Sequence, residues 1–160
     1  MLEMNENGMP DDEFLEDDDT TKDLYLIFET DNEDYALDVA GVIEIIPMPA
    51  ITFVPHVQPY MKGIINLRGD IVPVISVRKR FGKTEIPYND LTCIVVIKHG
   101  EYTLGLIVDS VSGVMPITPD LIAPPPSARL SHSNMFIKNV GKTEGGIKLL
   151  LDVEKVIFDS

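Results

Sequence analysis

Histidine and cysteine, the side chains that most readily ligate transition metals or act as nucleophiles, are scarce and scattered in this sequence of 160 residues. His56, His99 and His132 stand far apart, and neither an H-x-x-x-H nor a C-x-x-C spacing is present. Cys93 lies in an apolar run, where a thiol normally serves as a packing residue. Dinucleotide, P-loop and nucleophile-elbow motifs are all missing. The sequence therefore predicts no catalytic residues, no metal site and no cofactor.

Carboxylates gather at the start of the chain. Asp17, Asp18 and Asp19 form a run, but the glycine-bearing loop and closing glutamate of a calcium site are missing. Much of the formal net charge of −13 falls in residues 1–23, which hold ten acidic residues and one lysine. We expect residues 1–22 to be a disordered, solvated acidic tail, with partner binding as the alternative. The remainder is mildly acidic, which argues against nucleic acid as a partner.

Beyond the tail the pattern is that of an all-β protein with little helix. Apolar, β-branched runs at 24–30 and 33–39 flank Asp31-Asn32, a turn pair that tolerates positive φ. A second hairpin spans 63–82 with Arg68 and Gly69 at its tip. Further hairpins are predicted within 92–111 and 134–153, and residues 152–158 have helical spacing.

Two segments allow more than one interpretation. Residues 41–49 could form a bent strand or a short helix, and the spacing of Val42, Ile43, Ile45 and Ile46 favours the helix. Pro73 interrupts the returning strand of the second hairpin and cannot donate a ladder hydrogen bond, which predicts a sheet edge or a bulge. The prolines between 116 and 126 predict an extended surface connection.

The strand count predicts two lobes of about five strands each within residues 23–158. Neither lobe alone could bury much apolar surface, so we expect the two to share one hydrophobic core. No apolar run approaches the ~20 residues that span a bilayer. The N-terminus lacks the features of a secretory signal, and a single cysteine cannot form an internal disulfide. These features predict a soluble cytoplasmic protein without direct membrane insertion.

Several separated blocks resemble one known family. The string GIINLRGDIVPVISVRKRFG (63–82) is similar to the signature region of the CheW family of chemotaxis coupling proteins. It is preceded by YALDVAGVIEIIPMPAITFVPHVQPYMKG and followed by FIKNVGKTEGGIKLLLDVEKVI, which resemble the flanking family segments. The resemblance covers residues 24–158. Ser76 stands where many relatives have Asp, and Asn139 where Gly is usual.

The resemblance implies two SH3-like five-stranded β-barrels with short helical segments packed over a common core. It also implies a non-enzymatic cytoplasmic adaptor that binds chemoreceptor (methyl-accepting chemotaxis protein) tips and the CheW-like regulatory domain of the CheA histidine kinase. Such an adaptor would be a monomer in isolation and part of membrane receptor arrays. Two alternatives stay open: a CheW-like module of a larger protein with a receiver domain, and an enzyme or small-molecule-binding barrel.

The candidate interface centres on the predicted hairpin tip. A guanidinium there could recognise a partner or could brace the fold through a carboxylate, and the resemblance places Glu44 as that carboxylate. The hypothesis is that this pair shapes a receptor-facing surface. Its members are Val42, Glu44, Gly63, Asn66, Leu67, Arg68 and Gly69. A receptor tip is a helical hairpin, which predicts an apolar groove between the lobes for a helix face, with the kinase at a barrel end.

A basic run of Arg78, Lys79, Arg80 and Lys83 follows the signature. It could attract an anionic partner, but we interpret it as the solvated end of a strand.

Overall fold

Two β-sheets, each curled into a small barrel, make up the part of the chain that the computed structural model describes, residues 21–125 and 135–158. Residues 1–20 of the predicted acidic tail therefore lie outside the described residues. The elements follow one another in this order: β1 (Leu24–Thr30), β2 (Glu33–Asp38), the 3₁₀ turn η1 (Val39–Gly41), β3 (Val42–Pro47), β4 (Met61–Leu67), β5 (Asp70–Ser76), α2 (Val77–Arg80), β6 (Cys93–His99), β7 (Tyr102–Val108), β8 (Ser110–Pro116), η2 (Pro119–Leu121), β9 (Ile122–Ala123), β10 (Ile137–Thr143), β11 (Gly146–Leu151) and α3 (Val153–Phe158).

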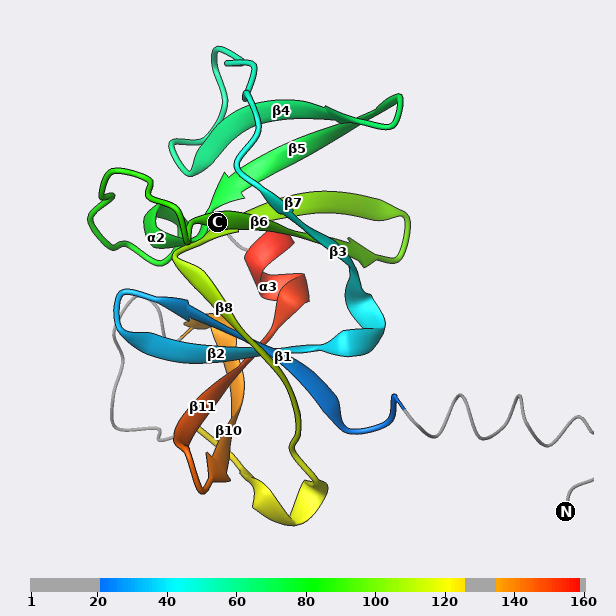
Figure 1. The fold of residues 1–160 in the computed structure, drawn as a ribbon, viewed down its shortest axis with the longest axis vertical. Coiled ribbons are helices and arrows are strands. Elements are labelled where there is room, and N and C mark those ends of the chain that lie inside the picture. The colour runs from blue at the N-terminus through cyan, green and yellow to red at the C-terminus, as the bar shows by residue number, and fades with distance from the viewer. Residues whose placement is uncertain (1–20, 126–134, 159–160) are drawn as a thin grey trace, which may run out of the picture.

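The two barrels are here called lobe 1 and lobe 2. Lobe 1 has the strand order β3-β6-β7-β5-β4, and lobe 2 has the order β8-β1-β2-β11-β10-β9 (Figure 1). Each sheet is antiparallel except for one parallel pair, β5 with β7 in lobe 1 and β11 with β2 in lobe 2. The predicted all-β class, the two lobes and the short C-terminal helix are thus confirmed.

Two hairpin tips form where the turn chemistry predicts them. Asp31 and Asn32 join β1 to β2 with φ of 54° and 66°, a left-handed pair suited to the twist of two adjoining strands. Arg68 and Gly69 join β4 to β5 with φ of 52° and 90°. The second tip therefore projects the arginine side chain from a tightly defined backbone.

The helix expected at 41–49 is wrong, because Val42–Pro47 form strand β3, paired with β6. Half-buried and exposed residues alternate along β3, so its periodicity is that of a strand. The short helical spacing of the isoleucines was ambiguous, and pairing with the buried strand β6 decides the outcome in favour of β structure.

Pro73 does not lie on an edge strand, since β5 sits between β7 and β4. The parallel pairing with β7 begins only at Val74, one residue later. On the other side Pro73 faces Ile64, whose backbone N–H and C=O both bond to Thr52 and therefore point away from β5. The missing N–H of the proline consequently costs neither ladder a hydrogen bond.

One apolar cluster joins the two lobes. It contains Phe28 and Tyr35 from lobe 2, Leu104 and Leu106 from lobe 1, and Phe136, all at most 4% exposed. Each lobe also has a smaller cluster of its own. The prediction of a shared core is confirmed, and the shared cluster is the largest of the three.

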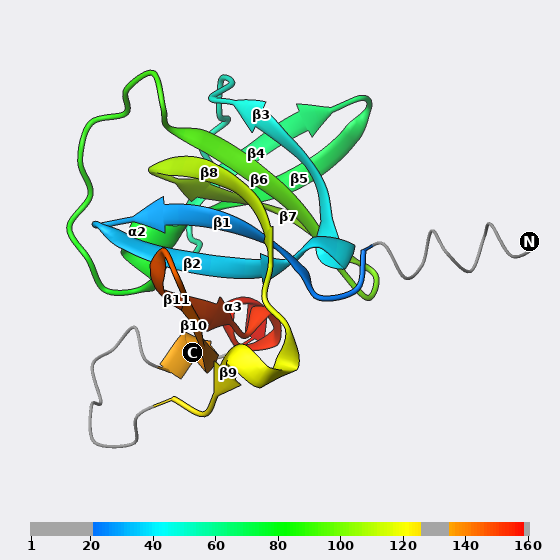
Figure 2. The ribbon, with the colours of Figure 1, turned by 60° about the horizontal axis from the view of Figure 1, so that its bottom comes forward.

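The topology is duplicated, and each lobe combines strands from both halves of the chain. Lobe 1 takes β3, β4 and β5 from the first half and β6 and β7 from the second, while lobe 2 takes β1 and β2 from the first half and β8 to β11 from the second (Figures 1 and 2). The parallel pairs Val74–Gly105 and Leu150–Ala36 are counterparts. Val74 lies two residues before Ser76, the residue that precedes α2. Leu150 likewise lies two residues before Asp152, the residue that precedes α3.

Irregularities of register recur at the same places in both lobes. The pairing shifts between Val42 and Glu44 on β3, and it shifts at the matching point where β8 meets β1. It also shifts between Met61 and Gly63 on β4 and between Ile137 and Asn139 on β10. Counting along the paired strands therefore identifies counterparts residue by residue: Glu44 with Gly113, Arg68 with Glu144, Arg78 with Glu154, Asp109 with Ala40, and Asp31 with Gly100.

Candidate partner-binding surface

A hollow of about 580 Å³ opens at the mouth of lobe 1, beside the Arg68 tip. Its apolar members include Ile71 and Tyr102, which are 61% and 56% exposed although they are large and hydrophobic. Large apolar side chains exposed together commonly mark a site of protein–protein contact. The lining consists of Ile43, Glu44, Leu67, Arg68, Asp70, Ile71, Val72, Pro73, Val96, Lys98, Glu101, Tyr102 and Thr103.

Glu44 and Arg68 form an ion pair across this mouth. The guanidinium Nη2 donates to Oε2 of Glu44, and Nη1 lies 3.4 Å from Oε1. The arginine side chain is 68% exposed, so the pair lies at the surface, where an ion pair adds little stability. The pair links the hairpin tip to β3 and keeps a charged fork accessible at the rim.

Of the other predicted interface residues, only Leu67 lines this hollow. Asn66 accepts a hydrogen bond from the backbone N–H of Gly69 at 2.9 Å and so shapes the tip. Val42 is half-buried and packs against the shared core. Asn66 and Val42 therefore position the tip and β3 rather than enlarge the exposed surface of the mouth.

Gly63 is buried and closes the barrel of lobe 1. Thr52 pairs with Ile64 outside the named strands, and this bridge joins the chain beyond β3 to β4. A Cβ at Gly63 would lie 2.1 Å from the carbonyl oxygen of Thr52, and φ here is 146°. Only glycine fits both conditions, so the role of this residue is closure of the barrel.

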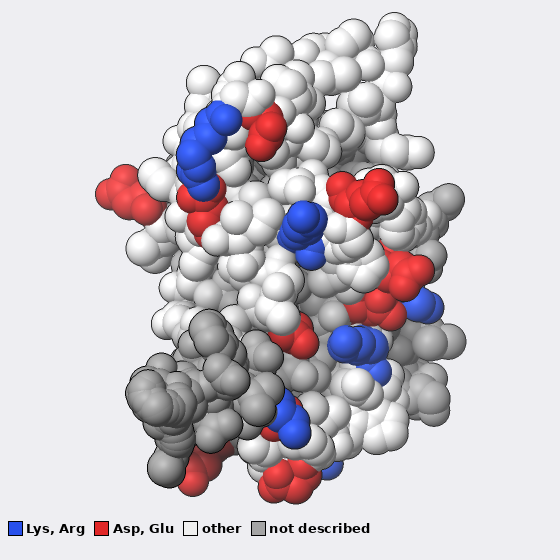
Figure 3. Space-filling view, turned by 90° about the vertical axis from the view of Figure 1, so that its right-hand side faces the viewer, with Lys and Arg blue, Asp and Glu red and all other residues white. Residues whose placement is uncertain are grey.

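A second hollow, of about 530 Å³, lies between the lobes, and we call it the inter-lobe groove. Apolar side chains at its base come from both lobes, among them Leu37, Ile97 and Leu151. Acidic and basic side chains are mixed on the side of the molecule that carries η1 and the β6–β7 turn (Figure 3). The lining consists of Tyr25, Leu37, Asp38, Ala40, Gly41, Ile97, Lys98, His99, Gly100, Lys138, Leu151, Asp152, Val153 and Glu154. Lys98 lines both hollows, so the two adjoin on the surface.

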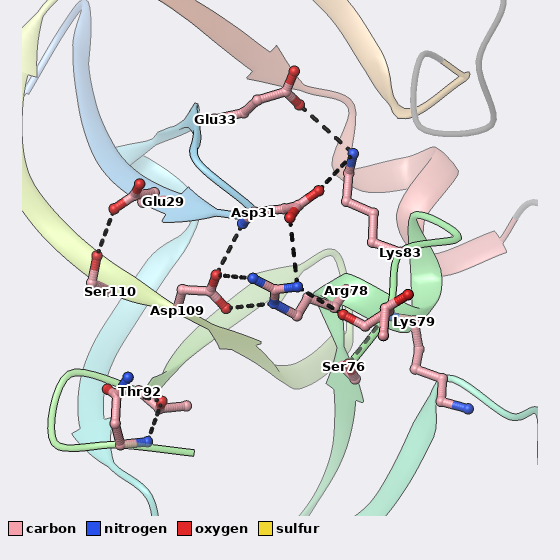
Figure 4. A network of polar contacts seen from close by, with 12 residues as sticks. Glu29, Asp31, Glu33, Ser76, Arg78, Lys79, Lys83, Thr92, Asp109 and Ser110 are labelled. Carbon is pink, nitrogen blue, oxygen red and sulfur yellow. Dashed lines mark hydrogen bonds and ion pairs between the residues drawn. The ribbon is translucent and has the colours of Figure 1, made fainter. Parts of the chain in front are cut away.

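Arg78 lines the counterpart of the inter-lobe groove on the other side of the molecule, and its polar contacts close that site (Figure 4 shows the contacts). Its guanidinium holds Asp109 through two hydrogen bonds, 3.0 Å from Nε and 2.7 Å from Nη2, and lies 3.6 Å from Asp31. Lys83 approaches Asp31 at 3.4 Å, and the backbone N–H of Asp31 donates to Asp109 at 2.9 Å. A void of only about 10 Å³ is left beside this network.

The network shifts the ionisation of its carboxylate. Burial alone would raise the pKa of Asp109, but hydrogen bonds from Arg78 and from the backbone of Asp31, together with the charge of Arg78, hold that pKa below its usual value. The same contact raises the pKa of Arg78, although burial acts in the opposite direction. Both groups are therefore charged at neutral pH.

The basic run 78–83 is not a solvated strand end, and that interpretation is wrong. Arg80 is 3% exposed, donates to the carbonyl oxygens of Val156 and Lys155, and lies over the rings of Tyr60 and Phe136 at 4.3 and 4.7 Å. Arg78 is held in the carboxylate network described above, and among the four only Lys79 is exposed. The closeness of these residues in the sequence suggested one basic patch. In the structure Arg78 contacts Asp109, whereas Arg80 contacts α3, so the two arginines of α2 point in different directions.

Cys93 is half-buried and packs beside the shared core, and burial raises the pKa of its thiol. Among the described residues no three His, Cys, Asp or Glu side chains come together as a metal site, and His132 lies outside those residues. Within the same part of the chain no helix is long and apolar enough to cross a bilayer.

Sequence reasoning missed Ile71 and Tyr102 at the mouth and the residues of the inter-lobe groove. The alternation along 70–76 gave a usable signal for Ile71, because it places this residue on the face opposite the buried Val72 and Val74. The groove had no local signal, since its walls come from segments far apart in the sequence.

The sequence was compared with protein families and with characterised proteins. A family model described as the CheW-like domain matches residues 24–159. The chemotaxis protein CheW of Klebsiella aerogenes is 31% identical over 139 residues, which are 87% of this chain and 84% of that protein. The chemotaxis protein CheW of Bacillus subtilis is 31% identical over 137 residues, 86% of this chain and 88% of its own length.

A solved structure agrees with the fold. The crystal structure of the scaffolding protein TtCheW from Thermoanaerobacter tengcongensis superposes with a TM-score of 0.79 at 31% identity, covering 86% of this chain and 93% of that one. Since the family model spans nearly all of the described residues and the fold matches as well, this chain belongs to the CheW-like domain family.

Proposed function

We propose that this chain is a non-enzymatic adaptor of bacterial chemotaxis that couples chemoreceptors to a CheA histidine kinase. The observation that carries the proposal is the presence, on a CheW-like fold, of two adjoining partly apolar hollows, one of which has the Glu44–Arg68 pair at its rim. An adaptor needs rigid recognition surfaces and no reacting groups. The described residues offer such surfaces at the mouth of lobe 1 and at the inter-lobe groove. Two relatives carry the name chemotaxis protein, and a third is called a scaffolding protein.

The inter-lobe groove suits the helical tip of a receptor. An amphipathic helix recognised in a groove needs an apolar floor with charges along the rims. Leu37, Ile97 and Leu151 supply the floor, while Lys98 and Glu154 are among the charged residues at the rim. Arg68 extends the same surface towards the mouth of lobe 1, where a receptor helix or its neighbour would meet the guanidinium.

The CheW-like regulatory domain of the kinase would then dock at a barrel end, so that both partners bind one adaptor at once. In this arrangement the chain is a monomer in isolation, works in the cytoplasm and joins receptor arrays at the membrane without inserting into it. Of the seven interface residues, Glu44, Leu67 and Arg68 would touch a partner. Val42, Gly63, Asn66 and Gly69 would hold them in place.

Reconstitution tests the proposal. Receptor in nanodiscs, kinase and this chain should assemble, and kinase activity should rise well above that of kinase and receptor alone. Arg68→Ala should weaken assembly and activation, whereas Lys142→Ala, which removes an exposed cation from a different hairpin, should leave both unchanged. Wild-type protein that binds neither partner would overturn the proposal, and substrate turnover by the purified chain would favour an enzyme instead.

A further inference from the structure

The two hollows at the lobe junction are counterparts in the duplicated fold, yet one is open and the other is sealed. Four residues lining the small void are Ser76, Arg78, Ile107 and Asp109. Their counterparts, by the register of the paired strands, are Asp152, Glu154, Asp38 and Ala40, and all four line the inter-lobe groove. The volumes are about 10 and 530 Å³. The small void is therefore filled by residues that have no equivalent among the described residues of the inter-lobe groove.

Part of the filling is the connection between the two halves of the chain. Residues 85–88 and Thr92, which lie between α2 and β6, line the sealed hollow together with Arg78. This connection is fixed by an ion pair from Lys62 to Glu85 at 2.8 Å and by a hydrogen bond from Arg78 to the carbonyl oxygen of Thr84 at 2.7 Å. It runs along one side of the molecule, whereas the chain enters β1 on the opposite side (Figure 2).

The segment before β6 has its counterpart in the segment before β1. Because Cys93 corresponds to Leu24, Thr92 corresponds to Asp23 and Glu85 to Glu16. The residues that match 85–88 are therefore 16–19, the acidic run that follows Phe14 and Leu15. By this count the N-terminal segment holds the place in the sequence before β1 that the connection 85–88 holds before β6.

The groove lies within reach of this segment, and two lysines stand among the charged residues of its lining. Tyr25 lines the groove and lies only two residues after Asp23. The nine residues from Leu15 to Asp23 span about 30 Å when extended, which is long enough to reach across the groove. Within the described part of the chain, Lys98 and Lys138 are exposed and have no ion-pair partner. The groove also holds three carboxylates, of which Asp38 and Asp152 each accept a hydrogen bond from a backbone N–H of the turn or helix that they cap, and Glu154 is the third.

We propose that residues 14–19 dock in the inter-lobe groove, with Phe14 and Leu15 against its apolar base and the carboxylates of 16–19 beside Lys98 and Lys138. The docked segment is an internal competitor for whatever binds there. Its consequence for receptor binding rests on the function proposed above, whereas the docking itself does not. Glu154 is the counterpart of Arg78, the residue that seals the other side. The inter-lobe groove therefore has no arginine at this position to close it, and the docked segment can be displaced.

Paramagnetic relaxation measured by NMR tests docking without any partner. A nitroxide is attached to Asp12→Cys in the full chain with Cys93→Ala, so that the label lies next to the proposed segment but outside it. Docking predicts selective broadening of the amides of Ala40, Lys98, Gly100 and Lys138. The amides of Arg78 and Asp109, on the sealed side, should stay sharp.

Two matched variants make the measurement decisive. Lys98→Glu with Lys138→Glu reverses the proposed charge contacts. Asp17→Asn, Asp18→Asn and Asp19→Asn together remove three of the four negative charges of residues 16–19 without touching the folded lobes. Each should reduce the broadening at the groove at least severalfold. If the broadening is the same in all three proteins, or is spread evenly over both sides, the segment does not dock there.

A second readout separates this proposal from the adaptor function. Removal of residues 1–19 should raise the apparent affinity for a receptor-tip helical hairpin about three- to tenfold, the gain expected when a groove that was open a tenth to a third of the time becomes always open. An unchanged affinity with intact binding would overturn the competition. A failure of the full-length and shortened proteins alike to bind the hairpin, with groove broadening present, would count against the adaptor function alone.

Discussion

Arg78 grips Asp109 through two parallel hydrogen bonds, 3.0 Å from Nε to Oδ1 and 2.7 Å from Nη2 to Oδ2 (Figure 4). The arginine follows β5 of lobe 1, and it also lies 3.6 Å from Asp31 at the β1–β2 tip of lobe 2. Such a fork-to-fork contact is stronger and more directional than an ordinary ion pair. It therefore helps to fix how the two lobes are oriented.

Arg78→Ala should destabilise the protein by about 2 kcal/mol, because it leaves a partly buried carboxylate without its charged partner. The side chains of Arg78 and Asp109 are only 14% and 25% exposed, so solvent screens the contact incompletely. Urea unfolding at pH 7 measures the change, with Lys142→Ala as the exposed control. A difference from wild type below about 0.5 kcal/mol would show that the network is dispensable.

The lowered pKa of Asp109 predicts acid sensitivity. A carboxyl group whose pKa is lower in the folded state contributes stability above its unfolded value, about 3.9, and that stability is lost as pH falls further through the folded pKa. Unfolding free energy should therefore decrease below about pH 4. Asp109→Asn should be less stable than wild type at pH 7, and the gap between the two should narrow in acid. A constant gap from pH 7 to pH 3 would contradict this assignment.

The sequence was most informative where local chemistry decides the structure. Asp31-Asn32 and Arg68-Gly69 form the predicted tips because their backbone preferences match a hairpin turn. The strand–helix choice at 41–49 went wrong because its apolar spacing satisfies both periods, and only the partner strand β6 resolves the ambiguity.

The lobe junction could not be predicted in the same way. Arg78 and Arg80 are two residues apart in the sequence, but Arg78 meets carboxylates of distant segments whereas Arg80 meets carbonyl oxygens of α3. The inter-lobe groove likewise draws its walls from both halves of the chain. Burial and pairing at such places depend on strand exchange between halves, which no local pattern encodes.

Gly63→Ala should open the barrel of lobe 1. The new Cβ would overlap the carbonyl oxygen of Thr52, at 2.1 Å, and the positive φ adds strain, so we expect a loss of about 3 kcal/mol or more. Hydrogen exchange at the amides of Thr52 and Ile64 should accelerate first. Gly41→Ala is the matched control, because its Cβ would meet only the carbonyl oxygen of Lys98 at an ordinary 3.5 Å. Equal effects of the two substitutions would contradict the closure role.

Arg80→Lys should lower the free energy of unfolding by about 2 kcal/mol, although it keeps the positive charge. An ammonium group cannot reproduce the planar fork that donates to Val156 and Lys155 while lying over two rings. Thermal unfolding followed by circular dichroism reports the loss, and Lys79→Ala on the exposed side of the same helix serves as the control. A lysine variant as stable as wild type would mean that charge alone holds α3 in place.

Arg68→Ala should separate binding from stability. Its side chain is 68% exposed, so breaking the ion pair with Glu44 should change the unfolding free energy by less than about 1 kcal/mol. Receptor binding should nevertheless weaken at least tenfold if the guanidinium meets the partner directly, which calorimetry with a receptor-tip fragment can measure. Glu44→Gln frees the arginine without removing it, and it should weaken binding less. A variant of Arg68 that unfolds easily would assign this residue to the support of the hairpin instead of to recognition.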